Sequence, residues 1–344
     1  MHEVGLVNIV TPSYNSAHLI PRLLDSILKQ TYPHISMSVI DDGSTDNTKE
    51  VINKYIPLFV LKGYQLQYIY QSNRGQSAAI NNGLKYVTGE FLAWPDADDW
   101  YKTDNAIATM VAALEQTGDV VGLVRCQMEY VKEQTLVVER TTSLTPCNIP
   151  CDLMDDAVFQ TNGFYYAPIG WMVKAKFLDL FIPQREIYVH KYAGQNAQML
   201  LPYLANSKCI TISDVHACYL VRKISSSHNL RPYENQLKYF EEHLNAFIVP
   251  LETIMPIPAE KRARYIKFRR AYYYRHYLEL DYTYSKTSEF NRHYQESQNL
   301  GLSIEDRFRE LYSWTRMFSI QTYKFVQRVT CKARRIFKKQ CLSN

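Results

Sequence analysis

The sequence contains no long hydrophobic run. No stretch within its 344 residues reaches the roughly 18 consecutive apolar residues that a membrane-spanning helix needs. The segment from Met1 to Tyr14 also lacks the basic-then-apolar order of a secretory signal. We therefore expect a cytoplasmic protein. Its hydrophobic content of 46% suffices for a core in one large domain with an extension, or in two domains.

Paired cysteines are missing as well. The chain has seven cysteines, but no Cys-x-x-Cys pair occurs, and no histidine pattern follows the two nearest cysteines, Cys147 and Cys151. Zinc sites and disulfide frameworks usually carry such spacings. We therefore expect free thiols.

Basic charge is scarce in the body of the chain and concentrated at its end. From Ala259 to Asn344 the chain carries 19 Lys and Arg against 8 Asp and Glu, whereas the rest carries 20 against 26. The overall charge of +5 therefore combines an acidic body with a basic tail. This asymmetry indicates an anionic partner for the tail, either a membrane surface or nucleic acid.

The first hundred residues alternate between strand and helix patterns. Four short apolar segments predict strands: Gly5–Val10, the segment that ends at Val39–Ile40, Gln67–Gln71 and Glu90–Trp94. A polar loop and a helical pattern follow each of them. This alternation predicts an α/β fold with a Rossmann-like, doubly wound, mostly parallel sheet, whose strand ends face one crevice.

The pattern changes after residue 116. Val120–Val138 predicts two strands joined as a hairpin, and Gln195–Leu204 predicts a helix. From about Pro232 onward the pattern is almost entirely helical. We therefore expect one domain over residues 1–230 and a basic, aromatic-rich helical extension over residues 231–344.

Three carboxylates follow the fourth predicted strand, at Asp96, Asp98 and Asp99. Side chains at that end of a strand lie at the edge where open α/β sheets bind ligands. Carboxylates two residues apart can hold one hard cation through their oxygens. The alternative is a solvated acidic turn that caps the helix beginning near Thr103.

The polar loops resemble the signature motifs of family-2 glycosyltransferases. Four motifs carry this resemblance, in order along the chain: Thr11–Asn15, Asp41–Asp46, Asn73–Gly83 and Asp96–Asp99. The resemblance implies a GT-A fold with a nucleotide-binding half at residues 1–100 and an acceptor half at residues 101–230. It also implies inverting transfer of a sugar from a nucleoside-diphosphate donor, most simply a UDP-sugar, to a hydroxyl of a glycan or lipid-linked acceptor. Bacterial polysaccharide or glycolipid assembly would suit such an enzyme.

The same resemblance implies roles for individual residues. Asp98 would bind Mn²⁺ or Mg²⁺, which lowers the barrier by taking up negative charge on the leaving diphosphate. Asp96 would lie near the ribose or the water shell of the metal. The positions that match nucleotide-sugar-binding residues are Thr11, Tyr14, Asp42, Asn73, Ser77 and Asp96. For Tyr14, packing against the sheet is an equal alternative to stacking on the base. Asp46 is expected to cap a helix.

A further match lies at Gln195 and Asn196. In many members of the family an aspartate at the second of these positions removes the proton from the acceptor hydroxyl, but an amide cannot act as a base near neutral pH. We interpret the two residues as the catalytic position of a diverged active enzyme that uses another base. Four residues are candidates for that base: Asp155, Asp156, Glu186 and His190. The amide also leaves open a noncatalytic nucleotide-sugar-binding protein on the same scaffold.

Two further segments carry expectations. Tyr219–Arg222 and the loop up to His228 resemble the end of the family's catalytic domain. There His228 would complete the metal shell, contact the diphosphate or be an exposed loop histidine. The aromatic residues from Phe159 to Trp171 would bind the acceptor or pack in the core. A nucleotidyltransferase is a rival function, but the loop Thr11–Asn15 is not the Gly-rich, basic phosphate loop that it would carry.

The tail has the pattern of a basic amphipathic helix. Apolar residues recur at helical spacing at Tyr323, Val326, Val329, Ala333, Ile336 and Phe337. We expect this helix either to bind an anionic membrane surface, which would make the protein peripheral on the inner face of the cell membrane, or to pack on the catalytic body. Nucleic acid is not expected, because no known binding motif accompanies the charge.

Overall fold

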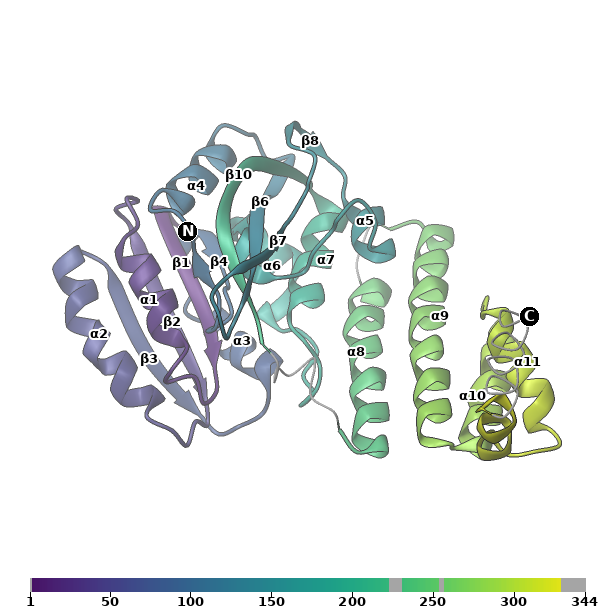
Figure 1. Cartoon of the computed structure of the whole chain (residues 1–344). Helices are drawn as coiled ribbons and strands as arrows, with labels where there is room; N and C mark the ends of the chain where they lie inside the picture. Colours follow the sequence, from purple (N-terminus) through teal and green to yellow (C-terminus); the bar gives the residue numbers. More distant parts are fainter. Residues whose placement is uncertain (1, 223–230, 254–256, 329–344) are drawn as a thin grey trace, which may run out of the picture. The chain divides into compact units, whose positions relative to one another are not determined.

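The computed structural model describes residues 2–222, 231–253 and 257–328. Its centre is a ten-stranded sheet, with β1, β2 and β3 side by side at one end (Figure 1). Eight of the strands follow the order β3-β2-β1-β4-β9-β6-β10-β5. The strands are β1 (Glu3–Ser13), β2 (Ile35–Asp42), β3 (Gln65–Gln71), β4 (Gly89–Ala93), β5 (Trp100–Tyr101), β6 (Val121–Lys132), β7 (Val138–Thr141), β8 (Cys147–Cys151), β9 (Trp171–Lys174) and β10 (Lys208–Val221).

Helices connect and follow these strands. In the order of the chain, the α-helices are α1 (Ile20–Leu28), α2 (Thr48–Lys62), α3 (Gln76–Leu84), α4 (Ala106–Glu115), α5 (Met154–Phe159), α6 (Leu178–Phe181), α7 (Asn196–Asn206), α8 (Tyr233–Thr253), α9 (Ala259–Tyr284), α10 (Thr287–Asn299) and α11 (Asp306–Thr315). Three short 3-10 helices are η1 (Pro168–Gly170), η2 (Ala175–Phe177) and η3 (Pro183–Arg185). The helices predicted over the first 116 residues and over 195–204 are all present.

The sheet runs mostly in one direction, as the alternating pattern predicts. β2 pairs in parallel with β1 and β3, and β4 pairs in parallel with β1. β9 is inserted between β4 and β6 in the opposite direction, so that β6 and its parallel neighbour β10 again follow the direction of β4. The register places Ser13 opposite Asp41 and Asp42 opposite Gln71. The polar residues that end β1, β2 and β3 therefore meet at one edge of the sheet.

The β6–β7 pair is antiparallel, which confirms the expected hairpin. The core of the sheet includes Trp94 and Trp171, both fully buried. Cys126, Cys209 and Cys218 are buried free thiols, as expected. Cys151 is in a disulfide, so the expectation of free thiols is wrong at that residue.

The chain forms two compact units. The first, called here the sheet unit, comprises Met1–Asn229 and Asn245–Arg262; the second, the helical unit, comprises Leu230–Leu244 and Ala263–Asn344. The helical unit has its own apolar cluster, formed by Leu278, Phe290, Tyr294, Phe308, Leu311 and Ile320. This confirms the expected helical C-terminal extension. Among the described helices, none combines the length and the apolar composition needed to cross a membrane.

Candidate active site

The loops that follow β1 and β2 are tied together by hydrogen bonds. The amide N of Asn15 donates to Ser44 Oγ at 2.8 Å, and Asn15 Oδ1 accepts from the amide N of Thr45 at 2.8 Å. Asn15 adopts a positive φ of 48°, a conformation that asparagine tolerates better than most residues. Tyr14 is 53% exposed, so part of its side chain is accessible to a ligand.

Asp42 joins the second loop to the third. Its Oδ1 accepts hydrogen bonds from the amide N of Arg74 at 2.9 Å and from Gln71 Nε2 at 2.8 Å, and its Oδ2 accepts from the amide N of Gly75 at 2.7 Å. A carboxylate offers about four lone-pair sites, and three are used here. Asp42 therefore holds the loop that contains Asn73 and retains room for one more donor.

Two glycines allow these loops to approach closely. Gly43 has φ +82°, and a Cβ there would lie 2.8 Å from the amide N of Asn73. Gly75 has φ +93°, and a Cβ there would lie 3.2 Å from the carbonyl O of His190. A side chain at either position would come too close to backbone atoms, and its residue would have to adopt a strained backbone conformation. The second contact places the backbone of His190, one of the four candidate bases, beside the third loop.

The aspartate turn after β4 continues the network. Asp96 Oδ1 accepts from Gln76 Nε2 at 2.6 Å and from Gln195 Nε2 at 2.9 Å. Asp98 Oδ2 accepts from Arg222 Nη1 at 3.1 Å. Asp99 is buried and accepts from the amide N of Leu220 at 2.9 Å. The turn is thus connected to α3, α7 and β10.

Burial and neighbouring negative charge disfavour ionisation of Asp96 and Asp99. Burial, followed by the charge of Asp98, raises the pKa of Asp96 to about 7, although the hydrogen bonds from Gln195 and Gln76 act to lower it. Burial, then Asp98 and Asp96, raise the pKa of Asp99 well above its ordinary value. Nearby positive charge would relieve this repulsion.

Several polar atoms at this edge have no hydrogen-bond partner within the described part of the chain. These buried atoms are Thr11 Oγ1, Asp99 Oδ2, Gln195 Oε1 and Asn196 Oδ1. Buried polar groups are almost always paired, so such orphans need an explanation by a ligand, an ion or a water. Ser77, in contrast, already donates to the carbonyl O of Ala193 at 2.6 Å, which ties α3 to the segment before α7.

Asp96 and Asp98 are the residues of this edge that could hold a divalent cation. Among the described residues, no group of three or more His, Cys, Asp or Glu side chains is arranged to hold a metal ion. Mg²⁺ is commonly bound by one or two carboxylates with the remaining ligands from phosphates and water. Asp98 and Asp96 meet that requirement. His228, the other proposed ligand, lies outside the described residues.

The candidate bases differ in their surroundings. Asp155 forms an ion pair with Lys261 at 3.1 Å. Asp156 Oδ1 accepts from Thr161 Oγ1 at 2.7 Å and from Asn162 Nδ2 at 2.8 Å, contacts that stabilise the end of α5. Glu186 is exposed. His190 is half-buried, and its Nδ1 accepts from the amide N of Tyr192 at 3.3 Å.

Two other expectations concern the aromatic segment and Asp46. Phe164, Tyr165 and Trp171 are all at most 9% exposed, so they belong to the core and the expectation of acceptor contacts is wrong for them. Asp46 Oδ1 accepts from the amide N of Thr48 at 3.0 Å, which confirms its expected role at the start of α2. The network also contains two residues to which no role was assigned from the sequence, Gln76 and Arg222. Gln76 lies inside the third motif and Arg222 directly follows β10, but no local pattern indicates which carboxylate either one contacts.

A family model described as glycosyl transferase family 2 matches residues 8–181, slightly more than half of the chain. The chain belongs to glycosyl transferase family 2. Its matches within the family include an uncharacterized glycosyltransferase of Nostoc sp., 36% identical over 178 residues that make up 52% of this chain and 53% of that protein. Chondroitin synthase of Pasteurella multocida is 32% identical over 143 residues, 42% of this chain and 13% of that enzyme. The chain therefore matches about half or less of the length of these relatives.

The fold of this family-2 member also resembles solved structures. The crystal structure of S. aureus TarS residues 1–349 in complex with UDP-GlcNAc superimposes with a TM-score of 0.60 and 17% sequence identity, covering 95% of this chain and 92% of that one. The similarity confirms the GT-A fold expected from the sequence.

Proposed function

We propose that the chain is a metal-dependent, inverting glycosyltransferase. It would transfer a sugar from a nucleoside-diphosphate donor to a hydroxyl of a glycan or lipid-linked acceptor in bacterial polysaccharide or glycolipid assembly. The observation that carries this proposal is the network in which the loops after β1, β2, β3 and β4 meet α7 at one sheet edge. Residues 1–100 would bind the nucleotide and residues 101–230 the acceptor, with residues 231–344 as an extension.

The residues at this edge suit binding of a nucleotide sugar. Tyr14, exposed at the mouth of the first loop, would stack on the base, and Asp42 would accept one further hydrogen bond from the base or ribose. Thr11, Asn73 and Ser77 would contribute to the same site. We take the donor to be a UDP-sugar, since the TarS structure of the same fold was determined with UDP-GlcNAc.

Asp98 and Asp96 would hold Mn²⁺ or Mg²⁺ at the diphosphate, where the cation would stabilise the charge of the leaving group. Asn196 cannot remove the acceptor proton. We propose His190 as the first base candidate to test, because its backbone lies against the third loop.

Binding and hydrolysis measurements test the proposal. A thermal-shift screen of UDP-, GDP- and dTDP-sugars with and without MnCl₂ should reveal one donor that raises the melting temperature only with the metal, because a ligand that binds the native state stabilises it. Slow hydrolysis of that donor would separate an enzyme from a noncatalytic binding protein. Stabilisation by no nucleotide sugar, with or without metal, would contradict the proposal.

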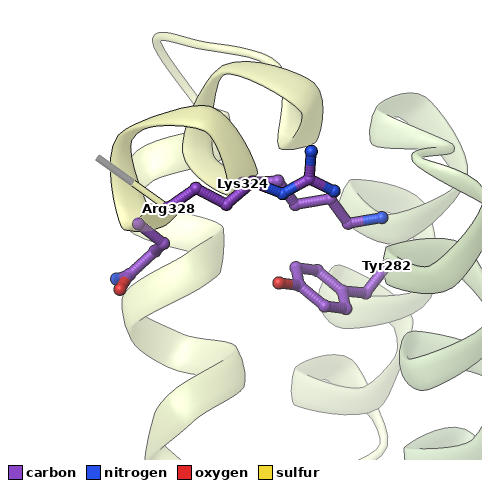
Figure 2. Close-up of a pocket in the computed structure, with 4 residues that line it drawn as sticks. Tyr282, Lys324 and Arg328 are labelled. Carbon is purple, nitrogen blue, oxygen red and sulfur yellow. The ribbon is translucent and has the colours of Figure 1, made fainter. Parts of the chain in front are cut away.

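We also propose that the helical unit contacts an anionic membrane. Three apolar side chains there are exposed: Met317 by 74%, Phe318 by 48% and Phe325 by 67%. The opposite side of this segment packs within the helical unit, because Ile320 is buried and Lys324 lies over the Tyr282 ring at 4.6 Å (Figure 2). The alternative expectation, packing of the helix on the catalytic body, stays a prediction. Val326 is 37% exposed, and the later residues of the predicted helix lie outside the described part of the chain.

Liposome sedimentation tests this contact. Replacing Met317 and Phe325 by serine should abolish binding to vesicles that contain anionic lipid at low salt, because insertion of apolar side chains is lost while the buried cluster is kept. Leu61→Ser, at an 84% exposed position of the sheet unit, is the matched control. Equal binding of the double variant and the control would show that the exposed residues of the segment do not insert.

A further inference from the structure

Arg222 is the basic side chain that contacts the aspartate turn. Its Nη1 lies 3.1 Å from Asp98 Oδ2, and its Nε lies 3.6 Å from Glu133 Oε1. Within the described residues, no other Lys, Arg or His forms an ion pair with Asp96, Asp98 or Asp99. The side chains of Arg222 and Asp98 are only 26% and 24% exposed. The pair is therefore screened less by solvent than a surface ion pair.

Glu133, the second carboxylate that contacts Arg222, is held in place by the sheet. Val221, the last residue of β10, pairs with Lys132, the last residue of β6. The amide N of Glu133 donates to the carbonyl O of Val221 at 3.1 Å. Glu133 and Arg222 therefore extend from two neighbouring strand ends that are fixed to each other. Arg222 has two anionic partners, and loss of the contact with Asp98 still leaves the contact with Glu133.

We propose that Arg222 competes with the divalent cation for Asp98 and thereby couples metal binding to diphosphate binding. This inference rests on the proposed function. A metal ion bound alone at Asp98 meets the positive charge of Arg222, so the guanidinium must withdraw toward Glu133. When a diphosphate is also bound, its negative charge compensates both cations, and the repulsion no longer opposes metal binding. Metal and nucleotide therefore strengthen each other's binding, and linkage requires the factor to be the same in both directions.

Calorimetric titrations of the full chain test the competition. The probes are MnCl₂ alone, UDP alone, and MnCl₂ in the presence of saturating UDP. Arg222→Gln should bind Mn²⁺ alone about 5- to 10-fold more tightly than the native chain, and the gain that UDP gives to Mn²⁺ affinity should shrink by a similar factor, within the usual range of coupling between sites. Arg222→Lys keeps the charge and should remain close to the native chain.

Two further variants complete the test. Glu133→Gln removes the second partner of Arg222 and should weaken binding of Mn²⁺ alone. Arg140→Gln removes a guanidinium that lies over the Tyr130 ring and should leave Mn²⁺ binding unchanged, which controls for loss of one positive charge from the sheet unit. A melting temperature measured for each variant identifies any loss of folding.

The outcomes separate this inference from the proposed function. If the native chain binds Mn²⁺ with UDP but Arg222→Gln binds Mn²⁺ alone no better than the native chain, the competition is wrong and the function stands. Weaker Mn²⁺ binding by Arg222→Gln would likewise overturn it, because Arg222 would then orient Asp98 for the metal. A native chain that binds no Mn²⁺ with or without UDP overturns both the competition and the metal dependence.

Discussion

The sheet unit and the helical unit each contain a buried polar network, and the two networks differ in completeness. In the helical unit, Asp281 is fully buried and accepts from Tyr233 Oη at 2.5 Å and from His293 Nδ1 at 2.7 Å. Arg292 Nη2 lies 2.8 Å from His293 Nε2, and because arginine can only donate, Nε2 accepts and Nδ1 carries the proton. This network joins α8, α9 and α10, and the atoms named here are all paired.

The hydrogen-bond network of the sheet unit is incomplete. Asp99 Oδ2, Gln195 Oε1 and Asn196 Oδ1 are buried without partners among the described residues. Each such group costs about 1–3 kcal/mol relative to a paired one. A fully paired network, as in the helical unit, stabilises a fold. A network with unpaired atoms at the edge of an α/β sheet retains bonding capacity for a ligand. The comparison predicts that mutations in the network of the sheet unit reduce activity, whereas mutations in the network of the helical unit reduce stability.

Asp98→Asn should have the largest effect on activity. The amide keeps the shape of the side chain but loses the charge that the proposed cation needs, so transfer should fall by at least about 10³-fold. The melting temperature should change little, since Asp98 is a partly exposed residue in a turn. Initial rates with and without MnCl₂ measure the effect. Retained activity, or metal-independent activity of the native chain, would contradict the assignment.

Asp281→Ala should show the opposite pattern. It leaves the Tyr233 hydroxyl and His293 Nδ1 buried without their shared acceptor, and each buried polar group that loses its partner costs about 1–3 kcal/mol. Denaturant unfolding measures the loss. Asp281→Asn keeps one acceptor oxygen and should cost less. A large fall in the transfer rate of the folded Asp281→Ala protein would show that the two networks are not separable by function.

The sequence predicted most of the architecture because its signals were local. The strand and helix patterns of residues 5–116 depend on short-range periodicity, and the motif loops lie at strand ends, where parallel pairing brings them together. The reversed direction of β9 was not predicted, since strand direction depends on pairings between residues far apart in the chain. The same limit applies to Gln76 and Arg222, whose partners Asp96 and Asp98 lie 20 and 124 positions away.

The aromatic segment shows a different limit. The rings from Phe159 to Trp171 could serve a ligand or the core, and composition alone does not distinguish the two. Burial decides the matter, because Trp171 is fully buried and Tyr165 Oη donates to the carbonyl O of Cys126 at 2.6 Å. Burial depends on the whole fold, so no local pattern supplies it.

Gln195→Ala and Gln76→Ala should have an intermediate effect on activity. Both side chains donate to Asp96 Oδ1, so each variant frees the carboxylate to rotate and should lower kcat/KM by about 10- to 100-fold through misplacement. The double variant should lose less than the product of the two single effects, since they share one acceptor. Gln67→Ala, which removes a hydrogen bond to Ser38 within the sheet, is the control and should retain native kcat/KM. Multiplicative effects would show that the two glutamines act independently and not through their shared acceptor.

Asn196→Ala should have the smallest effect, a loss of less than about 10-fold in kcat, because an amide positions the acceptor but takes no proton from it. Replacing the true base should instead remove most of the turnover, since general base catalysis contributes about 10²- to 10⁴-fold. The four candidates are compared by alanine substitution at Asp155, Asp156, Glu186 and His190. Asp156→Ala is informative in a second way, because its contacts with Thr161 and Asn162 predict a loss of stability with native kcat. A loss of 10³-fold or more at Asn196, with little effect at all four candidates, would mean that the amide is essential and that proton removal does not depend on a side chain of this set.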